Sequence, residues 1–170
     1  MKESTFQKEF KAQASFRLDE STRMIVKTFK ALDEADIWRK PNPSSNSIGN
    51  LILHLCGNIS QYAISSLGGT DDFRNREEEF SAAPGYSRDE LLERLLQVVD
   101  RAKTVISNCS GEELLRSRQV QGFTMSGIGI IVHVVEHYSY HTGQIAFWTK
   151  LLKDKDLGFY EGEDLNIKNI

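Results

Sequence analysis

The chain has 170 residues, of which 39% are hydrophobic and 26% charged, and its net charge is −3 at pH 7. This length fits one domain over residues 1–170, with a polar C-terminal tail over 153–170. Because 24 acidic residues stand against 21 basic ones, the chain has no positive surplus for binding a phosphate backbone, and we expect no nucleic-acid partner.

The chain starts with a segment that predicts one long helix. Residues 1–13 carry scattered charges where a signal peptide has an uninterrupted apolar core, so we do not expect export. From about residue 3 to residue 34, apolar side chains recur at spacings of three and four, as in an amphipathic helix. Pro41 and Pro43 then interrupt helical structure, because proline disfavours the helical conformation of the residue before it.

A second helix is predicted from a cap at Asn46 or Ser47 to Leu67. A pair of glycines ends this helix. The charged segment 70–86 that follows has no clear periodicity, and we interpret it as a surface loop with room for one helical turn.

The second half of the chain predicts two more long helices and a short one. A capping-box sequence opens a third helix over about 87–108, and a further serine cap predicts a short helix after Ser110. Residues 116–124 are interpreted as extended or irregular, and Ser126 can cap a fourth long helix that reaches about residue 152. Four long helices with essentially no strand pattern imply an all-α four-helix bundle.

Two long stretches are almost free of charge: 41–70 has none, and 119–149 has only Glu136. A membrane span needs about 20 mostly apolar residues, whereas both stretches carry many polar side chains, so we expect no membrane partner. We interpret both as helices buried on several sides. Three neighbours in a small bundle do not easily cover a second helix that lacks charge all around, so we expect part of it to face a second copy in a homodimer.

All four histidines of the chain lie in these two stretches. At 100° per residue, His133, His137 and His141 form one stripe about 80° wide on the inner face of the fourth helix, and Gln144 lies within it. On the second helix, an arc of similar width holds Asn50, His54, Asn58 and Gln61.

One interior histidine is more often a hydrogen-bonded core residue than a ligand. Three at i, i+4 and i+8 would repel when protonated or leave ring nitrogens without partners, and a divalent cation removes both problems. The i, i+4 spacing lets two imidazoles bind one ion, and His54 is the candidate third ligand because it is the only histidine outside the fourth helix. His133, Asn58 and Gln144 are candidates for alternative ligands or for residues that orient the ligands.

Three neutral histidines leave coordination positions open, which is typical of catalytic zinc sites. A general base is not evident, because the only charge near the stripe, Glu136, points about 100° away from it. Arg74 and Arg76 could hold a substrate anion at the mouth of the site, although a solvated ion-pair network with Glu77, Glu78 and Glu79 is the stronger interpretation. Cys56 and Cys109 form no C-x-x-C pair, so we interpret both as reduced, buried thiols of a cytoplasmic protein.

The segment His137-Tyr-Ser-Tyr-His141-Thr-Gly-Gln144, with His54 on the earlier helix, resembles the H-x3-H-x-x-Q segment of the DinB-like (DinB/YfiT) superfamily. The blocks 46–55 and 68–80 resemble an uncharacterised branch of it. The resemblance implies an up-down-down-up bundle, commonly a homodimer. It also implies a divalent ion held by His54, His137 and His141, nickel or zinc first, with iron, manganese or cobalt as alternatives.

Some members of that superfamily are thiol-dependent transferases or isomerases, and a shared fold does not transfer a reaction. Our first hypothesis is an enzyme in which the ion activates a low-molecular-weight thiol or water. The nucleophile would then attack a small electrophile in a pocket between the second and fourth helices, as in a transferase or hydrolase. The alternative is a non-catalytic protein in which the ion only ties the two helices together.

Overall fold

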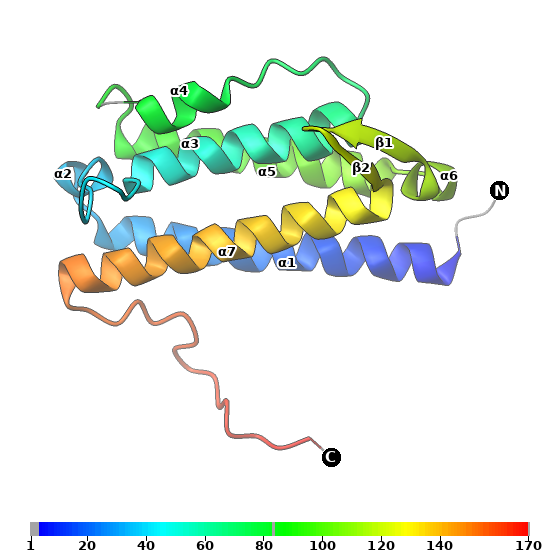
Figure 1. Cartoon of the computed structure of the whole chain (residues 1–170). Coiled ribbons are helices and arrows are strands. Elements are labelled where there is room, and N and C mark those ends of the chain that lie inside the picture. Colours follow the sequence, from blue (N-terminus) through cyan, green and yellow to red (C-terminus); the bar gives the residue numbers. More distant parts are fainter. Residues whose placement is uncertain (1–3, 83, 170) are drawn as a thin grey trace.

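The computed structural model describes residues 4–82 and 84–169. Its body is a bundle of four long helical segments: α1 (Thr5–Ala31), α3 (Ile48–Ile59) continued by the π-helix η1 (Ser60–Leu67), α5 (Arg88–Asn108) and α7 (Gly127–Lys153). α1 and α7 run in one direction, and α3 and α5 run in the other (Figure 1). The predicted all-α, up-down-down-up bundle is confirmed.

The shorter elements join the long helices. They are α2 (Glu34–Ile37), α4 (Arg76–Ser81), α6 (Gly111–Leu115) and the antiparallel strands β1 (Ser117–Val120) and β2 (Phe123–Ser126). The strands had been predicted only as extended or irregular chain. Gln121 and Gly122 close the hairpin with φ angles of 50° and 84°, the conformation that a tight two-residue hairpin turn requires.

Serine caps begin the long helices where the sequence predicts them. The side chains of Ser47, Ser87 and Ser126 each accept a hydrogen bond from the backbone N–H three residues later. The predicted start of the first helix at residue 3 lies outside the described residues. That helix ends at Ala31 rather than at residue 34, because Leu32 is extended and the next residues form the separate helix α2.

The second helix reaches Leu67 as predicted, but it changes from an α-helix to a π-helix at Ser60. The backbone N–H of Gly68 accordingly bonds to the carbonyl of Ala63, five residues earlier. A π-helix has a wider turn, so it shifts the faces of the residues after position 59 relative to a continuous α-helix.

The segment between η1 and α5, which contains α4 and is called the crossing segment below, covers the side of α3 that α5 and α7 leave open. α3 packs against α5, α7 and α4, and every residue of α3 except Gly57 is buried. The chain thus covers α3 itself, and the expected homodimer stays a prediction.

The C-terminal tail leaves the bundle after α7. Leu157 is buried, and Arg23 of α1 donates a hydrogen bond of 2.6 Å to the carbonyl of Phe159, so the start of the tail docks on the bundle. The rest of the tail extends away from the body (Figure 1). Among the described residues, none of the helices is both long and apolar enough to cross a membrane.

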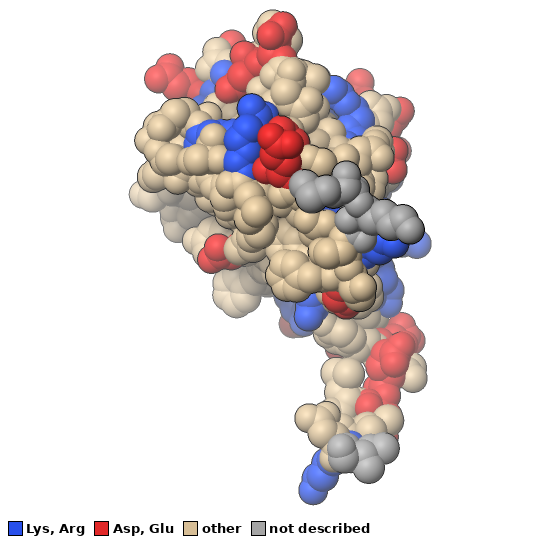
Figure 2. Space-filling model, turned by 90° about the vertical axis from the view of Figure 1, so that its right-hand side faces the viewer, with Lys and Arg blue, Asp and Glu red and all other residues tan. Residues whose placement is uncertain are grey.

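The end of the bundle that carries α6 and the hairpin shows basic and acidic side chains beside one another on a mostly uncharged surface (Figure 2). Glu113 accepts hydrogen bonds from Arg116 and Arg118 at this end. This face therefore presents no continuous patch of one sign.

Candidate metal centre

Three histidines from two helices meet between α3 and α7. Nε2 of His54 and Nε2 of His137 lie 3.2 Å apart, and one ring nitrogen from each of His54, His137 and His141 lies within 4.8 Å of the others. Two nitrogen ligands on one tetrahedral zinc ion are about 3.3 Å apart when each bond is about 2.0–2.1 Å long. The backbone thus places three imidazoles where small side-chain movements could bring them onto one ion.

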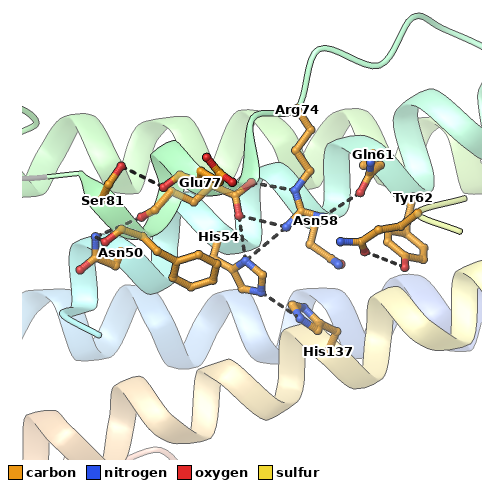
Figure 3. Close-up of polar contacts among 12 residues, drawn as sticks. Asn50, His54, Asn58, Gln61, Tyr62, Arg74, Glu77, Ser81 and His137 are labelled. Carbon is orange, nitrogen blue, oxygen red and sulfur yellow. Dashed lines mark hydrogen bonds and ion pairs between the residues drawn. The ribbon is translucent and has the colours of Figure 1, made fainter. Parts of the chain in front are cut away.

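The helical geometry explains this convergence. His137 and His141 lie one turn apart on α7, with ring centroids 4.5 Å apart. The ring of His54 on α3 faces both, at 4.9 and 5.0 Å, and Figure 3 shows its contact with His137. His54 is 6% exposed, whereas the two α7 histidines are only partly buried, so the cluster has a closed side and an accessible side.

Hydrogen-bond partners identify the free ring nitrogens. Nδ1 of His54 donates to Oε2 of Glu79 at 2.8 Å, and Nδ1 of His141 donates to Oε1 of Gln144 at 2.7 Å. Both rings therefore carry their proton on Nδ1, which leaves the Nε2 lone pair free to bind a cation. Gln144 thus contacts a ligand candidate, as the sequence predicted.

Glu79, which the sequence suggested only as an ion-pair partner of Arg74 or Arg76, lies directly behind the cluster. Glu79 and Arg74 form a buried ion pair, with side chains 7% and 3% exposed. Nε of Arg74 donates to Oε1 of Glu79 at 2.7 Å and Nη2 to Oε2 at 2.9 Å, and Nη1 donates to Gln61 at 2.8 Å (Figure 3). The expectation that Glu136 is the only charge near the histidines was wrong, although Glu136 is exposed as predicted.

The crossing segment is fixed so that Glu79 reaches His54. The Nδ2 group of Asn50 donates to the backbone carbonyls of Glu79 and Ala82, at 3.0 and 3.1 Å. Gly57 leaves room for the carboxylate, because a Cβ atom there would lie 1.9 Å from Oε1 of Glu79. The ring of Phe80 packs 4.8 Å from that of His54.

Burial and neighbouring charges set the protonation states. Burial would raise the pKa of Glu79, but hydrogen bonds from Arg74 and His54 hold that pKa below its usual range. Burial, followed by the charges of the neighbouring histidines, lowers the pKa of His137 to about 3. Burial also lowers the pKa of His133 and of His141, so these three imidazoles are neutral at pH 7.

The remaining predicted residues lie around the cluster. Nε2 of His133 contacts Nδ2 of Asn58 at 3.2 Å, and its ring stacks on Tyr62 at 4.1 Å, so His133 is not one of the three converging histidines. The guanidinium of Arg76 lies 4.9 Å from the Phe80 ring centre.

Arg74 forms an ion pair with one of the three glutamates that the sequence interpretation named, but not a solvated one. Its guanidinium binds Glu79, a carboxylate of the same chain, and the pair is buried rather than solvated. A substrate contact by Arg74 or Arg76 stays a prediction. Both cysteines are free and buried, in agreement with the sequence, and burial raises the pKa of Cys56 to about 12.

A cleft of about 750 Å³ lies beside the cluster, between α3, η1, α5 and the crossing segment. Of the residues that the structure describes, its lining includes Leu53 and Cys56 of α3 and no residue of α7, so it is not the pocket expected between the second and fourth helices. Arg74 and Glu79 form part of its wall, so the ion pair separates this cleft from His54.

Little in the sequence could have identified Glu79. It is one of three consecutive glutamates in a segment without periodicity, 25 residues after His54. Its selection depends on the position of the crossing segment over α3, which helical spacing does not specify.

Comparison with known proteins supports the fold. The model of a family described as "Protein of unknown function (DUF1572)" matches residues 5–160. A conserved protein from Enterococcus faecalis matches at 16% identity, covering 85% of this chain and 97% of its own, with a TM-score of 0.73. No curated protein matches this chain significantly.

Two solved structures carry the superfamily's name. A DinB-like protein from Bacillus subtilis matches at 16% identity, covering 87% of this chain and 96% of its own, with a TM-score of 0.66. One from Bacillus cereus matches at 14% identity, covering 84% and 90%, with a TM-score of 0.65. At these identities the matches establish a shared DinB-like fold, which confirms the resemblance seen in the sequence.

Proposed function

Because the chain belongs to the DUF1572 family, which is described as being of unknown function, we propose a function from the site itself: the protein binds one divalent first-row metal ion through Nε2 of three histidines. The ligands are His54, His137 and His141. Residues of two helices that pack together supply them, and Glu79 and Gln144 orient two of the rings.

The observation that carries this proposal is the 3.2 Å contact between Nε2 of His54 and Nε2 of His137. The proton of His54 is on Nδ1, so its Nε2 presents a lone pair to the neighbouring ring. These two Nε2 atoms lie at hydrogen-bond distance, and a divalent cation can take the place of the proton between them.

The donor set indicates the class of metal. Neutral imidazole nitrogens suit zinc, nickel, copper and iron better than magnesium or calcium, which prefer oxygen ligands. We propose nickel or zinc as the resident ion. Three protein ligands leave room for one exchangeable ligand, which distinguishes the site from a closed structural zinc site.

The same site favours a nucleophilic reaction of a small thiol or water. A divalent cation held there would lower the pKa of such a group and provide a nucleophile at neutral pH. We propose a cytoplasmic, thiol-dependent transfer to a small electrophile as the activity. The buried ion pair behind His54 would keep that imidazole in place, while the partly exposed histidines of α7 face the incoming molecule.

Metal analysis tests the binding proposal. Protein purified without an affinity tag should contain close to one first-row divalent ion per chain by mass spectrometry. The His137→Ala variant should lose most of it, whereas Glu136→Gln, an exposed neighbour on the same helix, should keep it. Full occupancy of His137→Ala would contradict the assignment.

A separate assay addresses catalysis. We expect metal-dependent turnover of monobromobimane or chlorodinitrobenzene with bacillithiol, glutathione or cysteine, and loss of turnover with a chelator. No turnover with any of these thiols, combined with a large drop in melting temperature on metal removal, would favour the non-catalytic alternative.

A further inference from the structure

We propose that Glu79, held by Arg74, is the positioning residue that fixes His54 as an Nε2 donor. The inference rests on the proposed metal site and extends it to a segment of the chain that supplies no ligand. It is carried by the contacts of one buried carboxylate, whose 2.8 Å bond to Nδ1 of His54 defines how that ring is presented.

The carboxylate selects one tautomer of His54. An ionised carboxylate only accepts hydrogen bonds, so a 2.8 Å contact with Nδ1 requires the ring proton to lie there. Nη2 of Arg74 also lies 3.2 Å from Nδ1 of His54. The same Nη2 is closer to Oε2 of Glu79, at 2.9 Å, and donates a hydrogen bond to that oxygen. The opposite tautomer would place a lone pair of Nδ1 against the carboxylate and a proton on Nε2, where a metal ligand needs its lone pair.

Arg74 offsets the energetic cost of burying the Glu79 carboxylate. A carboxylate with a side chain only 7% exposed is strongly destabilised unless a cation pairs with it. The two hydrogen bonds from Arg74 neutralise Glu79 and fix both of its oxygens, and Gln61 in turn fixes Arg74. The pair is neutral overall, and its carboxylate accepts the Nδ1–H of His54.

The backbone around Glu79 prevents it from swinging away. Asn50 holds the carbonyls of Glu79 and Ala82, while Phe80 packs on the His54 ring. Gly57 allows the carboxylate to approach α3 at a distance that any side chain there would block. Through these contacts, the crossing segment orients His54, the metal-ligand candidate on α3.

A partner of this kind changes metal affinity by about 10–100-fold in other metal sites. We therefore expect the Glu79→Gln variant to bind Zn²⁺ about 10–100-fold more weakly than the natural chain, measured by competition with a chromophoric chelator. Glu78→Gln is the matched control, since Glu78 is the exposed neighbour on α4 and should leave the affinity unchanged.

A second readout uses metal-free protein. Long-range ¹H–¹⁵N correlation spectra of histidine side chains report which ring nitrogen carries the proton. His54, assigned from the spectrum of His54→Gln, should be in the Nδ1–H form in the natural chain and in Glu78→Gln, and a mixture of both forms in Glu79→Gln. A structural role of Glu79 alone would lower stability without changing the tautomer.

Gly57→Ala keeps every charge and pushes the carboxylate away from α3, because the added Cβ would lie 1.9 Å from Oε1 of Glu79 and 3.0 Å from Nε of Arg74. It therefore tests the proposal if Glu79→Gln fails to fold. It should show the same mixed tautomer and the same direction of affinity change. A pure Nδ1–H form in both variants, with Zn²⁺ affinity within about twofold of the natural chain, would overturn the proposal. If the natural chain binds no Zn²⁺, the proposed function fails, while the metal-free spectra still decide whether Glu79 positions His54.

Discussion

At the scale of single residues, burial keeps the three imidazole rings of α7 neutral, with one proton on each ring. His133, His137 and His141 each have a pKa below the ordinary value, because burial disfavours the charged form of each ring. Neutral imidazoles are the form that binds metals. His137 and His141 are therefore neutral imidazoles at pH 7.

These shifts predict how the stability of the metal-free protein depends on pH. Histidines in the unfolded chain have a pKa near 6.5. As the pH falls below that value, the unfolded state binds protons that the folded state does not bind, which favours unfolding. The stabilisation by neutral histidines is complete above about pH 6.5 and is lost as the pH falls toward the lowered folded values, about 3 for His137.

Urea unfolding with a chelator, between about pH 5 and pH 7, checks this dependence above the range in which carboxylates titrate. His137→Gln should reduce the slope of unfolding free energy against pH by an amount that rises to about one proton toward pH 5, where the unfolded histidine is protonated. An unchanged slope in that variant would contradict the burial of a neutral His137.

At the scale of elements, the crossing between η1 and α5 depends on one amide. Asn50 is fully buried, its Oδ1 accepts from the Ser47 hydroxyl at 2.7 Å, and its Nδ2 donates to the carbonyls of Glu79 and Ala82. A residue that belongs to the first turn of α3 thus fastens a segment about 30 positions later.

Replacing Asn50 by Ala should leave buried carbonyl groups without partners and should lower the free energy of unfolding by about 1–3 kcal/mol. Amide hydrogen exchange in α4 should accelerate more than in α5. The matched change Asn75→Ala, at an exposed amide that bonds only to Glu78 among the described residues, should stay within about 0.5 kcal/mol of the natural chain. Equal effects of the two substitutions would show that Asn50 does not hold the segment.

At the scale of the whole molecule, α7 carries the surface best suited to a second copy. Val132, Tyr140, Phe147 and Leu151 are between 50% and 67% exposed and lie within about 100° on one face of this helix. α3 no longer supports the expected homodimer, since the chain buries it. The exposed apolar side chains of this α7 face support it, although Glu136 lies among them.

We therefore predict a homodimer in sedimentation experiments, above the 19.3 kDa of one chain. Phe147→Glu should shift the protein to monomers, because a charge buried in an apolar interface is strongly destabilising. Phe16→Glu, at a similarly exposed position on α1, should not shift it. A natural chain that sediments as a monomer would refute the prediction.

The sequence predicts the bundle well because its helix caps, its apolar periodicity and its prolines indicate the same helix boundaries. Serine caps, apolar periodicity and the two prolines specify where the long helices begin and end, and the histidine spacing on α7 specifies two of the three converging rings. The π-helix, the hairpin and Glu79 could not be predicted in this way. Each depends on contacts between residues far apart in the chain, as the bond between Glu79 and His54 illustrates.

The most direct test of the three-histidine site is an anomalous-difference map, recorded at the zinc edge, from crystals of metal-free protein soaked in Zn²⁺. We predict one peak per chain, about 2.0–2.2 Å from Nε2 of each of His54, His137 and His141. A peak elsewhere, or no peak between α3 and α7, would contradict the proposed metal site.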